Sequence, residues 1–305
     1  MENILDWGIK IVLWLQQFSP ALDLPFEAFT FTGGEDFLIL LMPLFYWCLD
    51  RNLGVRLTFI TALSTYLGGA AKLLANQPRP FQYDARVRQL THFSGGGFPS
   101  LHTQSTVTVW GYLASQVRRA WLWALGGVLM ILVPLSRIYL GVHFPTDIAG
   151  GYLTGVALLL LYLWLEPPAS AWLRQKGLPW QLGIALVVPC MLALPMPADE
   201  EIGITAAAIL MGMGIGFPLE RRWVGFEIGG IWWKQGLRLL LGIVVLMGLR
   251  VGLKVAFASC APEALLRFLR YVVISLWASL GAPWAFVKLR LAERRAEQHP
   301  GEGVA

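Results

Sequence analysis

Two histidines, an aspartate and three cations fall into three short segments whose residue types could hydrolyse a phosphate ester. The segments are Lys72 followed after six intervening residues by Arg79-Pro80, then Pro99-Ser100-Leu101-His102, then Ser136-Arg137 with His143 and Asp147. Imidazoles can attack phosphorus or carry protons, and arginine and lysine bind phosphate oxygens. All three segments lie at the ends of long apolar stretches, so we expect this chemistry at a membrane surface.

The pair formed by His143 and Asp147 is the candidate for the nucleophile. A spacing of four places both side chains on one face of a helix, but Pro145 argues against a regular helix at His143. We therefore expect a loop followed by a helix start, with Asp147 in the first turn. In either case the carboxylate can accept a hydrogen bond from one imidazole nitrogen, which fixes the tautomer and leaves the other nitrogen to attack phosphorus. The alternative is a structural pair in which the aspartate only satisfies a buried histidine.

The three cations predict a bound anion. Arg137 and Lys72 lie inside or at the end of apolar stretches, where a positive charge needs an anionic partner. Arg79 stands between Pro78 and Pro80, which hold the backbone extended. Few acidic residues lie close to these cations in the sequence, and arginine can form bidentate hydrogen bonds with phosphate. For Lys72 the alternative is that its stem reaches up to the lipid headgroups.

The middle segment supplies a helix start and the second histidine. Ser100 precedes an apolar stretch and is a candidate N-cap, and a helix N-terminus can also bind phosphate through its N–H groups. His102 would then lie in the first turn. A protonated imidazole there could deliver a proton to a leaving alkoxide.

The composition predicts an all-α polytopic membrane protein. Of 305 residues, 56% are hydrophobic and only 14% are charged, and the long stretches are continuously apolar rather than alternating. The net charge of +5 is modest, and we assign it to membrane topology rather than to nucleic-acid binding. The three cysteines show no metal-type spacing, and we expect no metal and no cofactor. We also expect no removable signal peptide.

The chain divides into four predicted parts. Residues 1–20 form an interfacial amphipathic helix, 21–168 the catalytic core, 169–290 additional transmembrane helices and 291–305 a cytoplasmic tail. Nine spans are expected, of which four follow the core. They run over residues 36–49, 55–75, 101–117, 120–139, 146–165, 180–196, 202–219, 237–257 and 268–289.

The charged residues alternate between the two sides of these spans. The basic side carries Arg51, Arg56, Arg118, Arg119, Arg174, Lys176, Arg221, Arg222, Lys288, Arg290, Arg294 and Arg295. The opposite side carries Glu35, Asp199, Glu200, Glu201 and Glu263, together with all three segments described above. By the positive-inside rule we expect the site to face the extracytoplasmic side of a bacterial-type inner membrane, with a cytoplasmic C-terminus.

The order Lys-x6-Arg-Pro, Pro-Ser-x-His, Ser-Arg-x5-His-x3-Asp resembles the signature of the type 2 phosphatidic acid phosphatases. These are also called lipid phosphate phosphatases, and their superfamily includes the vanadium haloperoxidases. The likeness covers residues 34–157. A weaker likeness of Gly34-Glu35, Tyr46-Trp47 and Asp50 points to sphingosine-1-phosphate phosphatases and long bacterial homologues. The resemblance implies a six-helix-type phosphatase core, here extended at the C-terminus.

The resemblance also implies roles for single residues. His143 would form a phosphohistidine, Asp147 would orient it and His102 would act as general acid. Lys72, Arg79, Arg137 and Ser100, with an amide near Leu101, would hold the phosphoryl oxygens without a metal. The family's common residue at position 101 is glycine. Leucine there puts the local backbone and the approach of that amide in question, because leucine resists positive φ.

We therefore expect a membrane phosphatase acting on a lipid phosphate or pyrophosphate, with the bilayer as its surroundings. Pro80, Arg86 and Arg88 are further candidates for contact with the substrate, although Arg86 and Arg88 could equally belong to a solvated loop. One alternative is a lipid phosphotransferase with the same intermediate. Another is a transporter or scaffold, for which Arg250 and Lys254 in the eighth span are the charged candidates. A homodimer is a further expectation.

Overall fold

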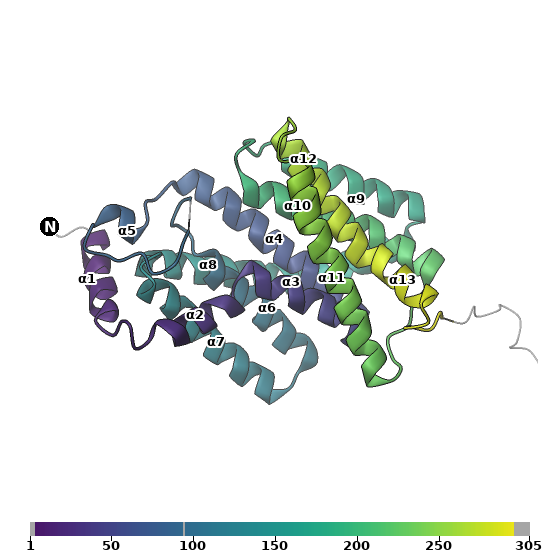
Figure 1. Ribbon diagram of the computed structural model, residues 1–305, viewed down its shortest axis with the longest axis horizontal. Helices are drawn as coiled ribbons and strands as arrows, with labels where there is room; N and C mark the ends of the chain where they lie inside the picture. The colour runs from purple at the N-terminus through teal and green to yellow at the C-terminus, as the bar shows by residue number, and fades with distance from the viewer. Residues whose placement is uncertain (1–3, 94, 296–305) are drawn as a thin grey trace, which may run out of the picture.

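The computed structural model describes residues 4–295 apart from Ser94, and it is built from helices (Figure 1). The N-terminal part contains α1 (Ile4–Gln16), α2 (Asp23–Thr32), α3 (Glu35–Leu44), η1 (Phe45–Leu49), α4 (Arg51–Ala75), α5 (Pro80–Tyr83), α6 (Leu101–Val117), α7 (Ala120–Tyr139) and α8 (Pro145–Gln175). The C-terminal part contains α9 (Leu178–Ala193), α10 (Glu201–Leu219), η2 (Glu220–Val224), α11 (Trp232–Ala256), α12 (Glu263–Leu276), η3 (Trp277–Gly281) and α13 (Ala282–Lys288). The η elements are π-helical turns. Over the described ranges no strand forms, and one isolated bridge pairs Phe226 with Arg294.

The prediction of an all-α polytopic membrane protein is confirmed. Among the described residues, six helices are long and apolar enough to cross a membrane, and a bent pair made of α2 and α3–η1 would add a seventh. The expected number of nine spans is therefore too high by length and composition. The two shortfalls are α6 and α9, which have 17 and 16 residues. The expected tail after residue 295 and the first three residues of the N-terminal segment lie outside the described residues.

Helix α6 is short and polar because it is surrounded by protein. It packs against α4, α7 and α8, and every residue from Thr103 to Ala114 is buried. Its polar side chains find partners inside the bundle: the Gln104 amide donates to the carbonyl oxygen and the hydroxyl of Ser64 at 2.7 and 3.0 Å. A helix that meets protein on every side can be polar where a lipid-facing helix cannot.

Several predicted helix bounds differ from the structure, and two of the differences have a clear physical cause. The span expected over residues 146–165 continues as α8 through Pro167 and Pro168 to Gln175, since prolines are tolerated in membrane helices whose neighbours satisfy the freed backbone groups. The first expected span lacks α2, which meets α3 at a 47° bend. The bend lies at Gly33, where a Cβ would come within 2.7 Å of Val133 on α7. Glycine therefore permits the close crossing that sequence periodicity does not reveal.

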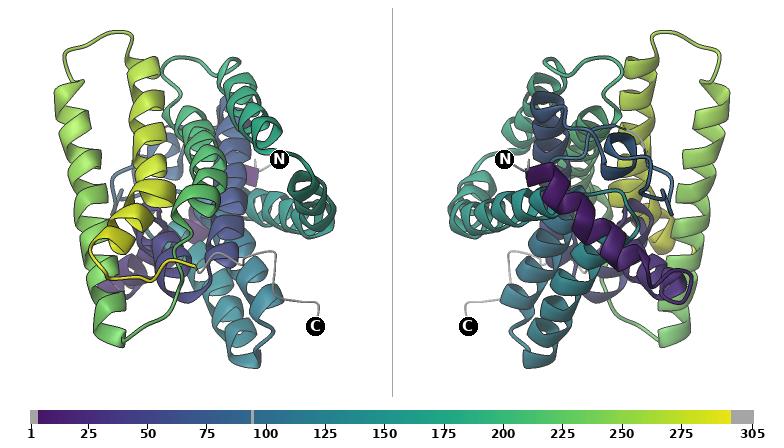
Figure 2. Two further views of the ribbon diagram at one scale, coloured as in Figure 1. Left: turned by 90° about the vertical axis from the view of Figure 1, so that its right-hand side faces the viewer. Right: turned by 90° about the vertical axis from the view of Figure 1, so that its left-hand side faces the viewer.

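The C-terminal helices pack along α4, from Arg51, which pairs with Glu220, to Gly69, which lies against the start of α10. Helix α10 contacts α4, α9 and α12, and α11 lies outermost, with α12 between it and α10 (Figure 2). The Tyr46 hydroxyl and the Trp47 indole N–H of η1 donate to the carbonyl oxygens of Ser279 and Ala278 in η3, both at 2.8 Å. Three of the four additional helices that we expected are long enough to cross a membrane, and α9 is a shorter apolar helix.

Candidate active site

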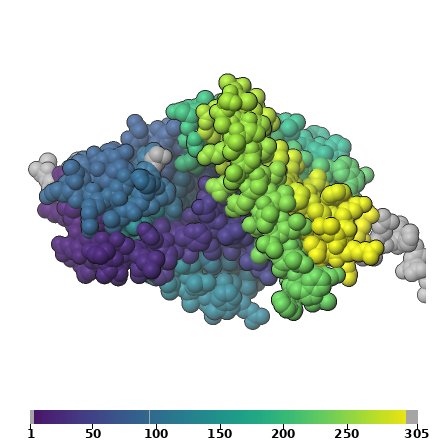
Figure 3. All heavy atoms as spheres, viewed as in Figure 1, coloured from purple at the N-terminus to yellow at the C-terminus, as the bar shows by residue number. Residues whose placement is uncertain are grey.

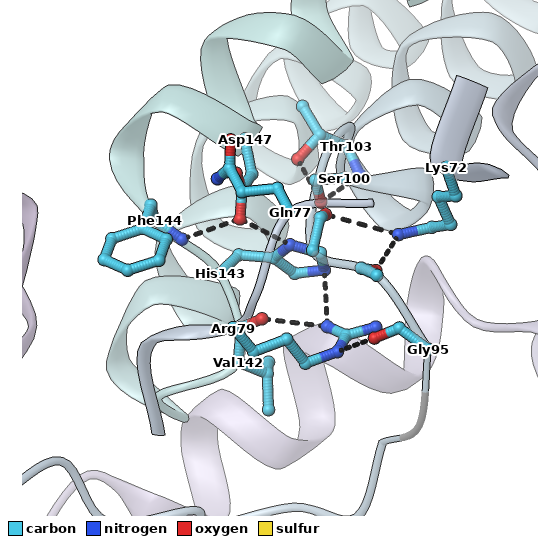
Figure 4. A network of polar contacts seen from close by, with 12 residues as sticks. Lys72, Gln77, Arg79, Gly95, Ser100, Thr103, Val142, His143, Phe144 and Asp147 are labelled. Carbon is cyan, nitrogen blue, oxygen red and sulfur yellow. Dashed lines mark hydrogen bonds and ion pairs between the residues drawn. The ribbon is translucent and has the colours of Figure 1, made fainter. Parts of the chain in front are cut away.

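The three sequence segments meet at one end of the helical bundle (Figure 4). Helices α4 and α7 end there, and α6 and α8 begin there. The residues come from the last turn of α4 (Lys72), the start of α5 (Arg79), the N-cap and first turn of α6 (Ser100, His102), the last turn of α7 (Arg137), the α7–α8 turn (His143) and the first turn of α8 (Asp147). Four helix ends thus bring together residues that are up to 75 positions apart in the chain.

His143 and Asp147 form a buried pair. The imidazole Nδ1 lies 3.2 Å from Asp147 Oδ2, and the two side chains are 3% and 0% exposed. The same carboxylate accepts from the Phe144 amide at 2.9 Å and from the Gln77 side-chain amide at 2.7 Å. Since α8 begins at Pro145, His143 precedes the helix and Asp147 lies in its first turn, as predicted. The carboxylate fixes the ring and directs Nε2 away from itself.

The surroundings keep the His143 imidazole neutral. Burial lowers its pKa well below the ordinary value, and the positive charges of Arg137, Lys72 and Arg79 lower it further. Because Asp147 accepts at Nδ1, the single proton of a neutral ring belongs there. Nε2 then carries the lone pair, which is the form that a nucleophile needs.

Lys72 and Arg79 hold the glycine-rich loop that follows them in the chain. The Lys72 ammonium donates to the carbonyl oxygens of Gly96 and Gly97 at 2.7 and 3.2 Å. Arg79 donates through Nε to Gly95 at 2.9 Å and through Nη1 to Val142 at 2.8 Å, and its Nη1 lies 3.4 Å from His143 Nε2. Carbonyl oxygens orient these cations without neutralising them, so their charge remains available to an anion.

Arg137 is buried and has hydrogen-bond donors without partners among the described residues. Its side chain is 0% exposed, and Nη1 donates to the Thr30 hydroxyl at 2.7 Å. Among the described residues, Nε and Nη2 of Arg137 have no hydrogen-bond partner. Its guanidinium carbon lies 4.2 Å from the centre of the Phe93 ring. Unpaired buried donors on a charged group are costly, and an anion with several acceptor oxygens would remove that cost.

Ser100 is the N-cap of α6, as predicted. Its buried hydroxyl oxygen accepts from the Thr103 amide at 3.4 Å and from the Thr103 hydroxyl at 3.0 Å. A serine hydroxyl that accepts these bonds still has its own proton to donate. His102 follows in the first turn, edge-on to the Phe93 ring at 5.5 Å between ring centres.

Leu101 fits the backbone without strain. The expected conflict with positive φ does not arise, because Leu101 is the first residue of α6 and the non-glycine residues with positive φ are Asn76, Arg118 and Arg290. The side chain instead packs onto α4 at Gly68, where a Cβ would lie only 2.1 Å from Leu101 Cδ2. A glycine on the neighbouring helix thus makes room for the leucine.

Two of the further candidates are not brought to this cluster. Arg86 donates to Asp84 at 2.7 Å, and these hydrogen bonds hold the Asp84 pKa down at about 2. Arg88 lies against α1, where its Nη2 donates to the Gln16 carbonyl oxygen at 2.9 Å. Pro80 is buried at the first position of α5. The described residues also bring no three histidine, cysteine, aspartate or glutamate side chains together as a metal site.

Three residues of the site were not foreseen from the sequence. Gln77 bonds Asp147, Thr30 bonds Arg137, and Phe93 lies against Arg79, Arg137 and His102. Gln77 lies between Lys72 and Arg79, so its position inside the first segment was a usable signal. Thr30 belongs to α2, and Phe93 belongs to a loop. Neither lies in a recognisable sequence motif, and only the fold brings them to the site.

Comparisons with known proteins agree with this arrangement. Residues 53–170, which contain all three segments, match the PAP2 superfamily, and residues 204–294 match the PAP2 superfamily phosphatase transmembrane extension. Lipid phosphate phosphatase delta of Arabidopsis thaliana is 27% identical over 208 residues, covering 62% of this chain and 50% of that protein. Sphingosine-1-phosphate phosphatase 1 of Rattus norvegicus is 31% identical over 136 residues, covering 43% and 32%.

An undecaprenyl-diphosphatase of Sulfolobus acidocaldarius is 33% identical over 122 residues, covering 38% of this chain and 56% of that protein. The chain thus spans between 32% and 56% of the length of these relatives. The first match contains the three segments, and the second covers most of α10 and all of α11 to α13, whereas α9 lies between the two matches. The chain therefore carries a PAP2 superfamily domain followed by the transmembrane extension of that superfamily's phosphatases.

Proposed function

We propose that this protein is an integral-membrane lipid phosphatase that works through a phosphohistidine at His143 and needs no metal. The observation that carries the proposal is the buried His143–Asp147 pair beside Arg137, whose Nε and Nη2 have no partner among the described residues. A phosphate group has the charge and the acceptor oxygens that these donors lack.

In the first step, His143 Nε2 attacks phosphorus and the bond from phosphorus to the lipid oxygen breaks. Lys72, Arg79 and Arg137 bind the phosphoryl oxygens and stabilise the charge that develops on them, with Ser100 and the amide near Leu101 as further donors. The negative charge of the bound phosphate offsets the neighbouring cations and favours a protonated His102, which gives its proton to the leaving alkoxide. Asp147 stabilises the positive charge that the phosphorylated His143 ring acquires.

In the second step, water attacks the same phosphorus atom from the side that the lipid alcohol has left. His102, now neutral, takes a proton from this water, and the phosphorus–nitrogen bond breaks. Inorganic phosphate leaves, His143 is restored as the neutral imidazole and His102 is again protonated. The charges that a metal ion would otherwise balance are balanced by the three cations.

The substrate class is a phosphate or pyrophosphate whose apolar part stays in the bilayer. Support comes from the apolar helices that surround the site and from the relatives, which are named for lipid phosphate, sphingosine-1-phosphate and undecaprenyl diphosphate. The candidates are polyprenyl pyrophosphates, phosphatidate or phosphatidylglycerophosphate, and sphingoid phosphates. The homodimer stays a prediction.

We further propose that the site faces the extracytoplasmic side of a bacterial-type inner membrane and that the C-terminus is cytoplasmic. The basic pair Arg118-Arg119 supports this, because it lies at the end of α6 opposite His102, roughly 25 Å away along the helix. A cysteine at position 118, in a variant without Cys48, Cys190 and Cys260, should resist an impermeant thiol reagent in intact cells. Labelling from outside would reject this orientation.

A phosphotransferase would use the same phosphohistidine with a lipid alcohol in place of water. Product analysis with a phosphorus-labelled substrate separates the two, since only hydrolysis releases inorganic phosphate. The transporter reading loses support because Arg250 pairs with Glu35 and Asp36 at 3.2 and 2.9 Å and so joins α11 to α3.

The proposal is tested with purified protein and a panel of polyprenyl, glycerolipid and sphingoid phosphates, assayed with and without EDTA. We expect phosphate release that EDTA does not inhibit, and an acid-labile, alkali-stable phosphoenzyme. His143→Ala should abolish both, whereas His92→Ala, which replaces an exposed histidine, should change neither. Full activity of His143→Ala on any of these lipids, or strong inhibition by EDTA, would reject the mechanism.

A further inference from the structure

The side chain of Gln16 joins three segments beside the site. It lies at the end of α1 and is 4% exposed. Its amide nitrogen donates to the carbonyl oxygens of Arg88 and Tyr139 at 2.7 and 3.1 Å, and its amide oxygen accepts from the Arg88 amide at 3.0 Å. Both donors and the acceptor of the amide are therefore used within the protein. The bonds connect α1, the loop before the glycine run and the last residue of α7.

The segment that Gln16 holds leads directly to His143. Gly141, two residues before His143, has a φ of +76°, and a Cβ there would lie 2.4 Å from the Arg88 carbonyl oxygen and 2.8 Å from Gln16 Nε2. The turn is thus pressed against Gln16 itself. The next residue, Val142, offers the carbonyl oxygen to which Arg79 donates. One short path of contacts therefore runs from Gln16 through Gly141 and Val142 to His143 and Arg79.

Helix α1 is well placed to hold this turn because its faces are divided among different surroundings. One face is buried against the protein: Gly8 lies so close to Phe144 that a Cβ would come within 2.9 Å of the ring. Another face exposes Ile4, Trp7 and Trp14, and Phe18 is exposed in the turn that follows, which suits the lipid interface. The α1 helix and the loop that contains Arg88 lie against each other at one end of the molecule in the space-filling view (Figure 3).

We propose that Gln16 is a positioning residue for the reaction: through its amide, the interfacial helix α1 fixes the turn that presents His143 Nε2 to phosphorus. This inference rests on the proposed function, because it assigns Gln16 a role only if His143 is the nucleophile. The role follows from distance. An attacking atom must be held within about 0.5 Å of its productive place, and a displacement of about 1 Å can cost on the order of 100-fold in rate.

The test compares Gln16→Met with Gln17→Met. Methionine keeps the length of the side chain but removes the hydrogen bonds, and Gln17 is the exposed residue that directly follows α1. For Gln16→Met we expect kcat to fall about 10-fold, with KM within about 2-fold and slower formation of the phosphoenzyme. Gln17→Met should match the wild type. All rates are expressed per folded molecule, with the folded fraction taken from size-exclusion profiles and melting temperatures.

A second measurement keeps the inference testable if Gln16→Met folds poorly. Gln16→Glu retains the acceptor for the Arg88 amide and loses both donated bonds, so it should show the same fall in kcat. Gly141→Ala acts on the same turn, and its effect on kcat should be less than multiplicative with that of Gln16→Glu. Wild-type kcat in both Gln16 variants, or effects that multiply, would overturn the positioning role. Absence of phosphate release from the wild type would instead overturn the proposed function.

Discussion

The two ends of α4 each carry a buried charge cluster, and the two clusters treat their charges differently. At the end that begins with Arg51, the buried Glu220 carboxylate accepts from Arg51 Nη1 at 3.0 Å and from the Phe226 amide at 2.9 Å. At the other end, roughly 30 Å away along the helix, Arg137 is equally buried but has two donors without a partner among the described residues. The Arg51–Glu220 pair satisfies both of its charges and holds helices together, although Arg238 Nε, nearby, also lacks a partner among the described residues. The two spare donors of Arg137 lie beside the His143–Asp147 pair, where we propose that they bind an anion.

Arg51, Glu220 and Arg238, which we call the fastening cluster, explain how the C-terminal extension is attached. Arg238 of α11 is 0% exposed, and its terminal nitrogens donate to the carbonyl oxygens of Trp47 in η1, at 3.2 Å, and of Gly229. Together with the bonds from Tyr46 and Trp47 to η3, these contacts join the extension to the core through one π-helical turn. These contacts lie at the Arg51 end of α4, far from the site, so the two clusters can be tested separately.

The largest effect should come from Arg137→Met. The substitution removes donors that are proposed to act on the phosphoryl oxygens, so we expect kcat/KM to fall about 1,000-fold, by analogy with the loss of one transition-state donor. The melting temperature should stay the same or rise, because an apolar side chain of similar length no longer buries an unpaired charge. Phosphate release and thermal unfolding in detergent measure the two effects.

The control for this variant is Arg119→Met, which removes an exposed arginine at the opposite end of α7. It should leave both activity and melting temperature close to those of the wild type. If Arg137→Met unfolds the protein while sparing the activity of the molecules that remain folded, Arg137 belongs with the fastening charges and the distinction between the two clusters is lost.

Glu220→Gln should produce the opposite pattern. It leaves the Arg51 charge without its carboxylate, and breaking a buried pair in this way costs about 3 kcal/mol of unfolding free energy. Activity per folded molecule should not change, since the cluster lies far from His143. Chemical denaturation measures the stability, and Glu227→Gln, at an exposed neighbouring position, is the matched control. A fall in kcat without a loss of stability would show that this cluster communicates with the site.

The sequence identified the candidate site residues better than the residues that contact and position them. Lys72, Arg79, Ser100, His102, Arg137, His143 and Asp147 could all be picked out because their types and spacing carry chemical meaning, and the helix starts at Leu101 and Pro145 follow from Ser100 and Pro145 themselves. Thr30, Phe93 and Gln16 could not be found, because each acts through a contact between segments far apart in the chain. Such contacts have no local signal.

The spans show the same division between local and distant information. Hydropathy identified α11, which is buried over little of its length, and also α10, which is more buried but continuously apolar. Hydropathy is less informative for helices whose structure depends on their neighbours. Helix α6 is polar because protein surrounds it, and α2 is joined to α3 by a bend that Gly33 permits. The fastening charges Glu220 and Arg238 were also missed, since nothing in the sequence distinguishes them from charges in loops.

Asp147 shares features with both clusters, and a change to its hydrogen-bond partner Gln77 should give the smallest of the expected effects. Like Glu220 it is a buried carboxylate with a backbone amide and a side chain bonded to it. Unlike Glu220, it holds a neutral imidazole whose other nitrogen is proposed to react. Gln77→Glu separates these roles, because the new carboxyl keeps the bond to Asp147 only while it is protonated and adds a negative charge near His143 once that proton is lost.

The added charge favours the protonated imidazole and so raises the His143 pKa, which burial and the three cations hold well below its ordinary value in the wild type. Since only the neutral ring attacks phosphorus, the acid limb of kcat/KM should move to higher pH, by about one unit for a charge at this separation. The ionisation of the substrate is common to both enzymes and cancels in the comparison. Gln77→Met, which removes the bond without adding charge, should lower kcat and leave the acid limb in place. An acid limb that moves equally in Gln77→Glu and Gln77→Met would show that the added charge is not the cause of the shift and would contradict this assignment to His143.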